Sequence, residues 1–171
     1  MQLGNHRPVS AGGGAPGGGA PGGGRPCAAA GSVLAVHSEE VRVRTGAAEV
    51  VADLTAEVAG FLRPHAGEDG LLHAWVPHAT AGLVVIETGA GSDRDLLAAL
   101  RDLLPADDRW THRHGSPGHG RDHVLPALLA PSMSVPVLAG RPAWGTWQSL
   151  CLVDTNVDNP VRTVRFSFLP G

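Results

Sequence analysis

The chain has 171 residues, enough for one domain, and 43% of them are apolar, which is enough to form a hydrophobic core. Its formal net charge is −3, so it lacks the basic bias that indicates a nucleic-acid partner, and we expect no nucleic-acid binding. No run of about 18 apolar residues is present, and we therefore expect no segment that spans a membrane.

Residues 1–31 differ in composition from the rest of the chain. The repeat AGGGAPGGGAPGGGRP cannot bury apolar area, and the region lacks the apolar segment of a secretory signal. We therefore predict a disordered glycine- and proline-rich tail over 1–31 and a single folded domain over 32–171. Cys27 lies in this tail and Cys151 in an expected buried strand, which predicts a reduced, cytoplasmic protein.

The first predicted elements of the domain are a strand and a helix. VLAVHSEEVRVRT, residues 33–45, alternates enough to form a strand. In 46–64 apolar residues recur at helical spacing, and Pro64 ends the predicted helix. A second, amphipathic helix is predicted for SDRDLLAALRDLLP, residues 92–105, with Ser92 as its N-cap.

Between these helices, GLLHAWVPHATAGLVVIET, residues 70–88, predicts two strands. We interpret the second part of this segment as a hairpin with His78 at its centre and Glu87 near its end. A lone histidine in an apolar hairpin is more often structural than catalytic. Glu87 is costly to bury unpaired, so it is either an exposed strand end or a functional acid.

The second half of the domain combines a polar loop, a short helix and three strands. Residues 106–122 are loop-like, and HVLPALLA, residues 123–130, predicts a helix that begins at His123. There the positive end of the helix would keep the imidazole neutral. The closing strands are expected at 133–140, 146–154 and 161–171. This order predicts an α+β fold, a mostly antiparallel β-sheet sandwich flanked by helices.

The chain contains nine histidines, and six of them lie between positions 73 and 123. Histidine serves metal sites and acid–base sites because it is a neutral donor near pH 7. His112 and His114 would face the same side of an extended chain, although such pairs are common in histidine-rich loops. His119, between two glycines, is expected to be solvated, and Asp122 is expected to be a helix cap.

These residues form a pattern that resembles the YjbQ family, also called secondary thiamine-phosphate synthases. The pattern is HATAG, a glutamate nine residues after its histidine, WTH, a second histidine eleven residues later, and GTWQ. It covers about residues 33–171. The resemblance implies a YjbQ-like homotrimer with weak activity that couples a pyrimidine diphosphate to a thiazole phosphate with loss of pyrophosphate. Ile86, Ala79 and Asp154 depart from the residues that are usual in the family.

The resemblance also implies the site residues. The three characteristic histidines of the family would act in catalysis together with its acid, and the same histidines would hold a divalent metal, zinc or magnesium. The GTWQ segment would contact substrate. The residues implied are His78, His112 and His123 for catalysis and metal, Glu87 for catalysis, and Thr146, Trp147 and Gln148 for substrate.

Several functions remain open on the sequence. The chain could be a transferase or a metal-assisted hydrolase acting on a phosphorylated small molecule, a non-enzymatic metal- or ligand-binding trimer, or a structural trimer. All 13 basic residues are arginines, so phosphate charge would fall to arginines such as Arg162, which is otherwise a solvated strand residue. We expect the three family histidines to converge to about 3–4 Å, and His114 and His119 to be dispensable.

Overall fold

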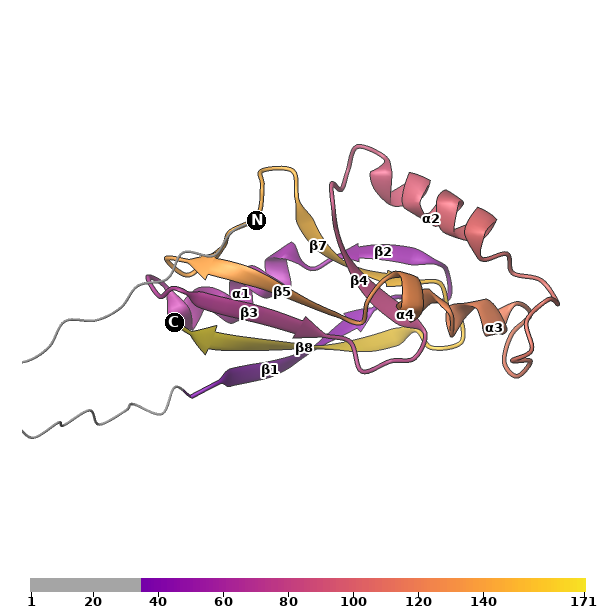
Figure 1. Cartoon of the computed structure of the whole chain (residues 1–171), viewed down its shortest axis with the longest axis horizontal. Coiled ribbons are helices and arrows are strands. Elements are labelled where there is room, and N and C mark those ends of the chain that lie inside the picture. The colour runs from indigo at the N-terminus through magenta and orange to yellow at the C-terminus, as the bar shows by residue number, and fades with distance from the viewer. Residues whose placement is uncertain (1–34) are drawn as a thin grey trace, which may run out of the picture. The chain divides into compact units, whose positions relative to one another are not determined.

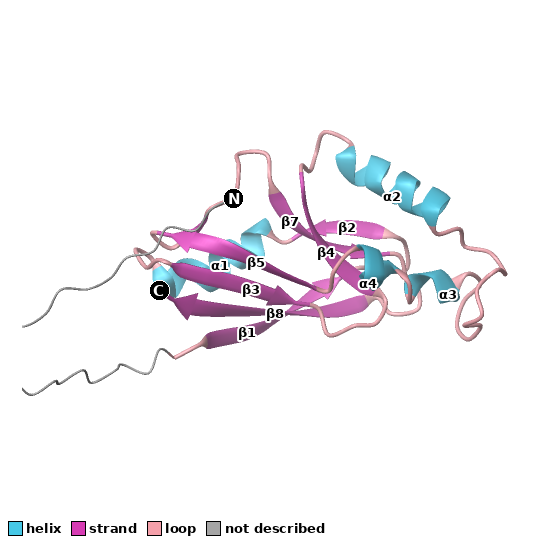
Figure 2. Ribbon diagram, in the orientation of Figure 1, coloured by secondary structure: helices cyan, strands magenta, loops and turns pink. Residues whose placement is uncertain are grey.

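The computed structural model describes residues 35–171, and the predicted tail lies outside this part of the chain. The strands form two sheets (Figures 1 and 2), a larger one in the order β1-β8-β3-β5-β6 and a smaller one in the order β2-β7-β4. All neighbouring strands are antiparallel, which confirms the predicted α+β class. Within residues 35–171, no helix combines the length and the apolar character needed to cross a membrane.

The elements have the following bounds. The strands are β1 (His37–Arg44), β2 (Val50–Asp53), β3 (Gly70–Trp75), β4 (Ala81–Ile86), β5 (Ser132–Leu138), β6 (Arg141–Pro142), β7 (Ser149–Asp154) and β8 (Val161–Pro170). The helices are α1 (Thr55–Leu62), the 3-10 turn η1 (Arg63–His65), α2 (Ser92–Leu103), α3 (His119–Asp122) and α4 (Leu125–Leu128).

Strand β7 is the central strand of the smaller sheet and is buried on both faces. Leu150 and Leu152 belong to the main core cluster, which also contains the inner residues of α1, β3 and β8. Val153 belongs to a second cluster with Leu100 of α2 and Leu125 of α4. Because both faces are covered, this strand is a continuous apolar run rather than an alternating one.

Strand β8 shows the alternation that the sequence predicts. Val164, Phe166 and Phe168 are fully buried, whereas Arg165 is exposed on the other face. Burying each phenylalanine side chain contributes about 1.5–3 kcal/mol. The larger sheet is therefore anchored through one face only, against α1 and the smaller sheet.

The helix predicted for 46–64 is wrong in its first half. Val50 and Val51 form β2 and pair with Asp154 and Val153 of β7, and α1 begins only at Thr55. Adjacent valines fit a helical apolar face and a strand equally well in sequence. The β-branched side chains and the available edge of β7 favour the strand.

The predicted hairpin around His78 is also wrong. Strand β3 pairs with β5 and β8, whereas β4 pairs with β7 in the other sheet. His78 lies in the connection between the two sheets, not at the centre of a hairpin. Each strand finds a better-buried partner elsewhere in the chain, which local sequence patterns do not reveal.

The region before β5 differs from its prediction as well. Residues 119–122 form α3, within the segment predicted as a loop, and His123 follows this helix instead of beginning the next one, which starts at Leu125. The helix-start argument for a neutral His123 therefore fails. Pro126 lies within the first turn of α4, where a proline is tolerated.

The chain after α4 packs closely on β4 at Gly82. Leu83 N donates a hydrogen bond to Ala130 O at 2.9 Å, and a Cβ atom at Gly82 would collide with the backbone carbonyl of Leu129. This contact fixes the end of α4 against the smaller sheet, where Leu125 of the same helix packs with Val153 of β7.

We predict that Gly82→Ala lowers the free energy of unfolding by about 1–3 kcal/mol, because backbone atoms must move to admit the methyl group. Gly60 provides the matched control. It lies in α1, and a Cβ there has nothing within 4 Å, so Gly60→Ala should be neutral or stabilising by up to about 1 kcal/mol. Urea unfolding of both variants measures the difference, and equal effects would contradict the close contact.

Candidate functional site

Four histidines gather around α3. His112 and His114 come from the loop after α2, His119 is the first residue of α3, and His123 follows it. One ring nitrogen from each lies within 4.8 Å of the others, and the Nε2 atoms of His119 and His123 are 3.0 Å apart. The pair at i and i+4 shares one helical face, and His112 and His114 alternate along the loop.

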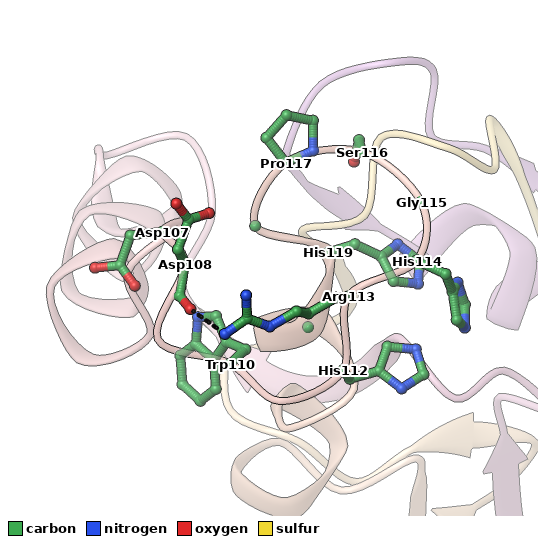
Figure 3. Close-up of a pocket in the computed structure, with 12 residues that line it drawn as sticks. Asp107, Asp108, Trp110, His112, Arg113, His114, Gly115, Ser116, Pro117 and His119 are labelled. Carbon is green, nitrogen blue, oxygen red and sulfur yellow. Dashed lines mark hydrogen bonds between the residues drawn. The ribbon is translucent and has the colours of Figure 1, made fainter.

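The four histidines lie between two hollows. In Figure 3, His112, His114 and His119 are opposite Asp107, Asp108 and Trp110 across a pocket of about 250 Å³. On the other side, His114, His119 and His123 also line a second pocket of about 330 Å³. A small molecule in either pocket would lie beside the imidazoles.

His119 is buried, with 6% of its surface exposed, so the expectation that it is solvated is wrong. Its Nδ1 lies 2.8 Å from the carboxylate of Asp158. Asp122 is buried too, and it accepts hydrogen bonds from Thr155 Oγ1 at 2.7 Å and from Asn156 Nδ2 at 3.1 Å. Asp122 thus holds the β7–β8 loop against α3 instead of capping a helix.

The electrostatics of the cluster favour a neutral imidazole at His112 and at His123. Desolvation, followed by repulsion from the other histidines, lowers the pKa of His123, although Asp122 opposes this shift. The pKa of His112 is lowered by desolvation and by His114 and His119. Neutral rings keep the lone pairs that a metal ligand needs.

His78 does not join this cluster: within residues 35–171, the histidines that the structure brings together are His112, His114, His119 and His123 rather than the predicted set of His78, His112 and His123. The Nε2 atom of His78 accepts a hydrogen bond from Thr163 N at 2.8 Å, so this nitrogen is already engaged within the protein. His78 instead lines the 330 Å³ pocket.

Arg162 lies beneath that pocket and is not a solvated strand residue. It is 2% exposed, and its Nε and Nη2 atoms donate to Asp154 at 2.6 and 2.8 Å. The guanidinium is therefore held by Asp154 while Arg162 also lines the pocket. Thr80, 5% exposed, adds a hydroxyl to the same wall. The lining contains no carboxylate.

Glu87 and the GTWQ segment lie at the other end of the smaller sheet. Glu87 follows the last residue of β4, whereas His78 precedes the first, so a strand of six residues, roughly 20 Å, separates them. Thr146, Trp147 and Gln148 are exposed in a turn before β7, where Gln148 Oε1 accepts from Gly145 N at 2.7 Å. The expectation that Glu87 lies close to the histidines fails within one chain.

This donor set fits a transition metal. Four imidazoles suit zinc and related ions, whereas magnesium prefers oxygen ligands. Two of the rings are exposed and two are more buried, so an ion held by all four would lie at the surface of the pocket. The sequence signal that was missed is the spacing HxxxH at 119 and 123, which puts both rings on one helical face.

The comparisons with known proteins agree with the fold. The model of the family described as UPF0047 protein YjbQ-like matches residues 39–171. The chain therefore belongs to the YjbQ-like UPF0047 family. A UPF0047 protein of Mycobacterium tuberculosis is 59% identical over 121 residues, 71% of this chain and 90% of that protein. YugU of Bacillus subtilis is 30% identical over 115 residues, 64% of this chain and 83% of that protein.

Solved structures show the same architecture. A hypothetical protein from Aeropyrum pernix has a TM-score of 0.71 at 29% identity, covering 79% of this chain and 99% of that one. A protein of unknown function from Sulfolobus solfataricus has a TM-score of 0.74 at 23% identity, covering 80% and 99%. These likenesses support the two-sheet fold that positions the histidines.

We predict that the metal-free protein loses stability as the pH falls below about 6.5. Desolvation, and then the charge of Arg162, lower the pKa of His78 from its ordinary value of 6.5, with Asp154 opposing. Between pH 6.5 and the lowered pKa, the side chain of His78 binds a proton in the unfolded chain but not in the folded chain. The free energy of unfolding therefore decreases as the pH falls through this range. Urea unfolding between pH 5 and 7.5 measures this, and the decrease should be smaller in His78→Gln.

Proposed function

We propose that the protein is a metal-dependent enzyme that acts on a phosphorylated small molecule, with the metal held by His112, His114, His119 and His123. One observation carries the proposal: four imidazoles converge within 4.8 Å beside a pocket without carboxylates. A pocket that has no carboxylates in its lining and lies beside a bound cation would favour an anionic ligand. A bound divalent ion would supply Lewis-acid stabilisation of negative charge.

The residues of the 330 Å³ pocket support binding of a phosphate. Because Thr163 N donates to Nε2 of His78, the neutral ring carries its proton on Nδ1 and is a donor there. Thr80 would add a hydroxyl and Arg162 a positive charge, since both residues line the pocket. Donors of this kind bind phosphate oxygens and orient them.

The reaction that the family resemblance implies is compatible with this pocket. The thiazole nitrogen forms a bond to the methylene carbon of the pyrimidine, while the bond from that carbon to the diphosphate oxygen breaks. Pyrophosphate leaves with the bonding electron pair, and charge collects on its oxygens. Arg162, His78 and Thr80 would bind those oxygens. Hydrolysis of a phosphorylated compound would use the same contacts.

Glu87 and the GTWQ segment can contribute to this site only through another copy of the chain, because they lie at the opposite end of β4 and β7. The resemblance implies a homotrimer. In a closed cyclic assembly with head-to-tail contacts, one end of each copy meets the opposite end of the next. The proposed trimer would thereby bring Glu87 and Gln148 to the histidines.

The metal site predicts tight zinc binding that depends on the buried histidines. The double variant His119→Ala/His123→Ala should bind zinc at least about 100-fold more weakly than the full chain, because two of the ligands are lost. Equilibrium dialysis with metal analysis measures the dissociation constant. His73→Ala is the control, since His73 hydrogen-bonds Ser134 in the larger sheet. Equal zinc affinity in the double variant would exclude this site.

The phosphate site predicts a second, separable effect. Thr80→Val keeps the shape of the side chain and removes its hydroxyl, so it should weaken pyrophosphate binding by roughly 10-fold or more, the worth of a hydrogen bond to a charged group. Calorimetry with zinc present measures this, and Ser38→Ala is the control, since Ser38 is an exposed hydroxyl residue of β1 that contacts Ser167 and does not line the pocket. Two turnover assays separate a transferase from a hydrolase. A transferase consumes the pyrimidine diphosphate only together with the thiazole phosphate, whereas a hydrolase releases phosphate from the diphosphate alone. Zinc binding without either turnover would indicate a binding protein.

A further inference from the structure

His119, the most buried histidine of the cluster, contacts a residue of another loop, Asp158. His119 presents Nε2 to His123 at 3.0 Å and Nδ1 to Asp158 Oδ2 at 2.8 Å. Asn156 Nδ2 also lies 2.8 Å from Nδ1 of His119. Two polar groups therefore compete for one ring nitrogen, and their chemistry decides its protonation.

A carboxylate oxygen can only accept a hydrogen bond. Contact with Asp158 at 2.8 Å therefore requires a proton on Nδ1 of His119. Asn156 can direct its amide hydrogen to Asp122 Oδ2 at 3.1 Å instead. The lone pair of the neutral His119 ring is then on Nε2, the atom that faces His123 and the other imidazoles.

Asp158 is itself fixed in place. Ser116 N donates to its carboxylate at 3.1 Å, and its own backbone N donates to Asn156 Oδ1 at 3.1 Å. Gly115 crosses directly over the pair: a Cβ atom there would lie 2.8 Å from Asp158 Oδ2 and from the ring of His119, and its φ is +85°. The loop therefore needs glycine where it passes the Asp158–His119 contact.

We propose that Asp158 is a positioning residue, which fixes the Nδ1–H tautomer and the ring orientation of His119 so that Nε2 is presented to the metal. This inference rests on the proposed function, because it assumes that the cluster binds a metal. Carboxylates that accept from the second nitrogen of a metal-binding histidine orient the ring and raise its basicity. Asp158 lies on the β7–β8 loop, 35 positions after His123 in the sequence. Its contact with His119 connects this loop to the segment that carries the histidines.

The first test needs no metal. Nitrogen-15 NMR of the metal-free full chain should show His119 as the Nδ1–H tautomer, and Asp158→Ala should shift it toward a mixture of both tautomers. Asp158→Asn, which keeps a carbonyl acceptor, should retain more of the wild-type tautomer. Asp102→Ala, at an exposed position of α2, is the control and should leave the tautomer unchanged.

The second test measures zinc affinity in the same variants. Asp158→Ala should bind zinc about 10–100-fold more weakly, Asp158→Asn should be intermediate, and Gly115→Ala should weaken binding because it forces the pair apart. An unchanged His119 tautomer in Asp158→Ala, or zinc affinity within twofold of wild type, would overturn the inference. If wild type binds no zinc while the tautomer still depends on Asp158, the proposed function fails and the hydrogen-bond assignment alone stands.

Discussion

The buried pair of Asp154 and Arg162 is the interaction on which the site depends. It joins the last residue of β7 to the second residue of β8, and so connects the smaller sheet to the larger one beneath the pocket. Asp154 also accepts a hydrogen bond from Asn156 N at 3.0 Å. A buried pair adds little net stability, but removing one partner costs about 3–5 kcal/mol because an unpaired charge remains.

Polar contacts extend from this pair to the histidines. Asn156 reaches Asp122 of α3, and Asp158 reaches His119. On the other side of α3, Arg121 donates to Leu104 O and forms an ion pair with Glu49. The helical turn that carries the buried histidine is thus held by charged groups on both sides. This arrangement lets a short helix, with little apolar surface of its own, keep its side chains in a fixed geometry.

The sequence predicts most of the elements but only part of the site. Alternation in 161–171 and the amphipathic pattern of 92–105 lead to β8 and α2, because both elements have one buried face and one exposed face. The hairpin around His78 fails because strand pairing is decided by partners far away in the chain, which local alternation does not encode. For the same reason Val50 and Val51 are misassigned to a helix.

Of the four histidines that the structure brings together, the motif contains His112 and His123, whereas it does not include His114 and His119, or Asp158 beside them. Glycines on both sides of His119 suggest an exposed loop, yet they are what allows the chain to pack: a Cβ at Gly120 would collide with the backbone carbonyl of His112. Close approach of backbone around a histidine therefore buries it. Asp158 is close to His119 in space but 39 positions away in the sequence, so no spacing rule connects the two residues.

Cys151 in the middle of β7 has a consequence for following the dynamics of this protein. It is fully buried, and desolvation, with smaller contributions from Asp53 and Asp93, raises the pKa of its thiol to about 12. Thiolate is the reactive form of cysteine, so this thiol is inert while β2, β7 and β4 remain paired. In a chain in which Cys27 is replaced, the rate of modification by a thiol reagent would report how often the smaller sheet opens, without any added probe group.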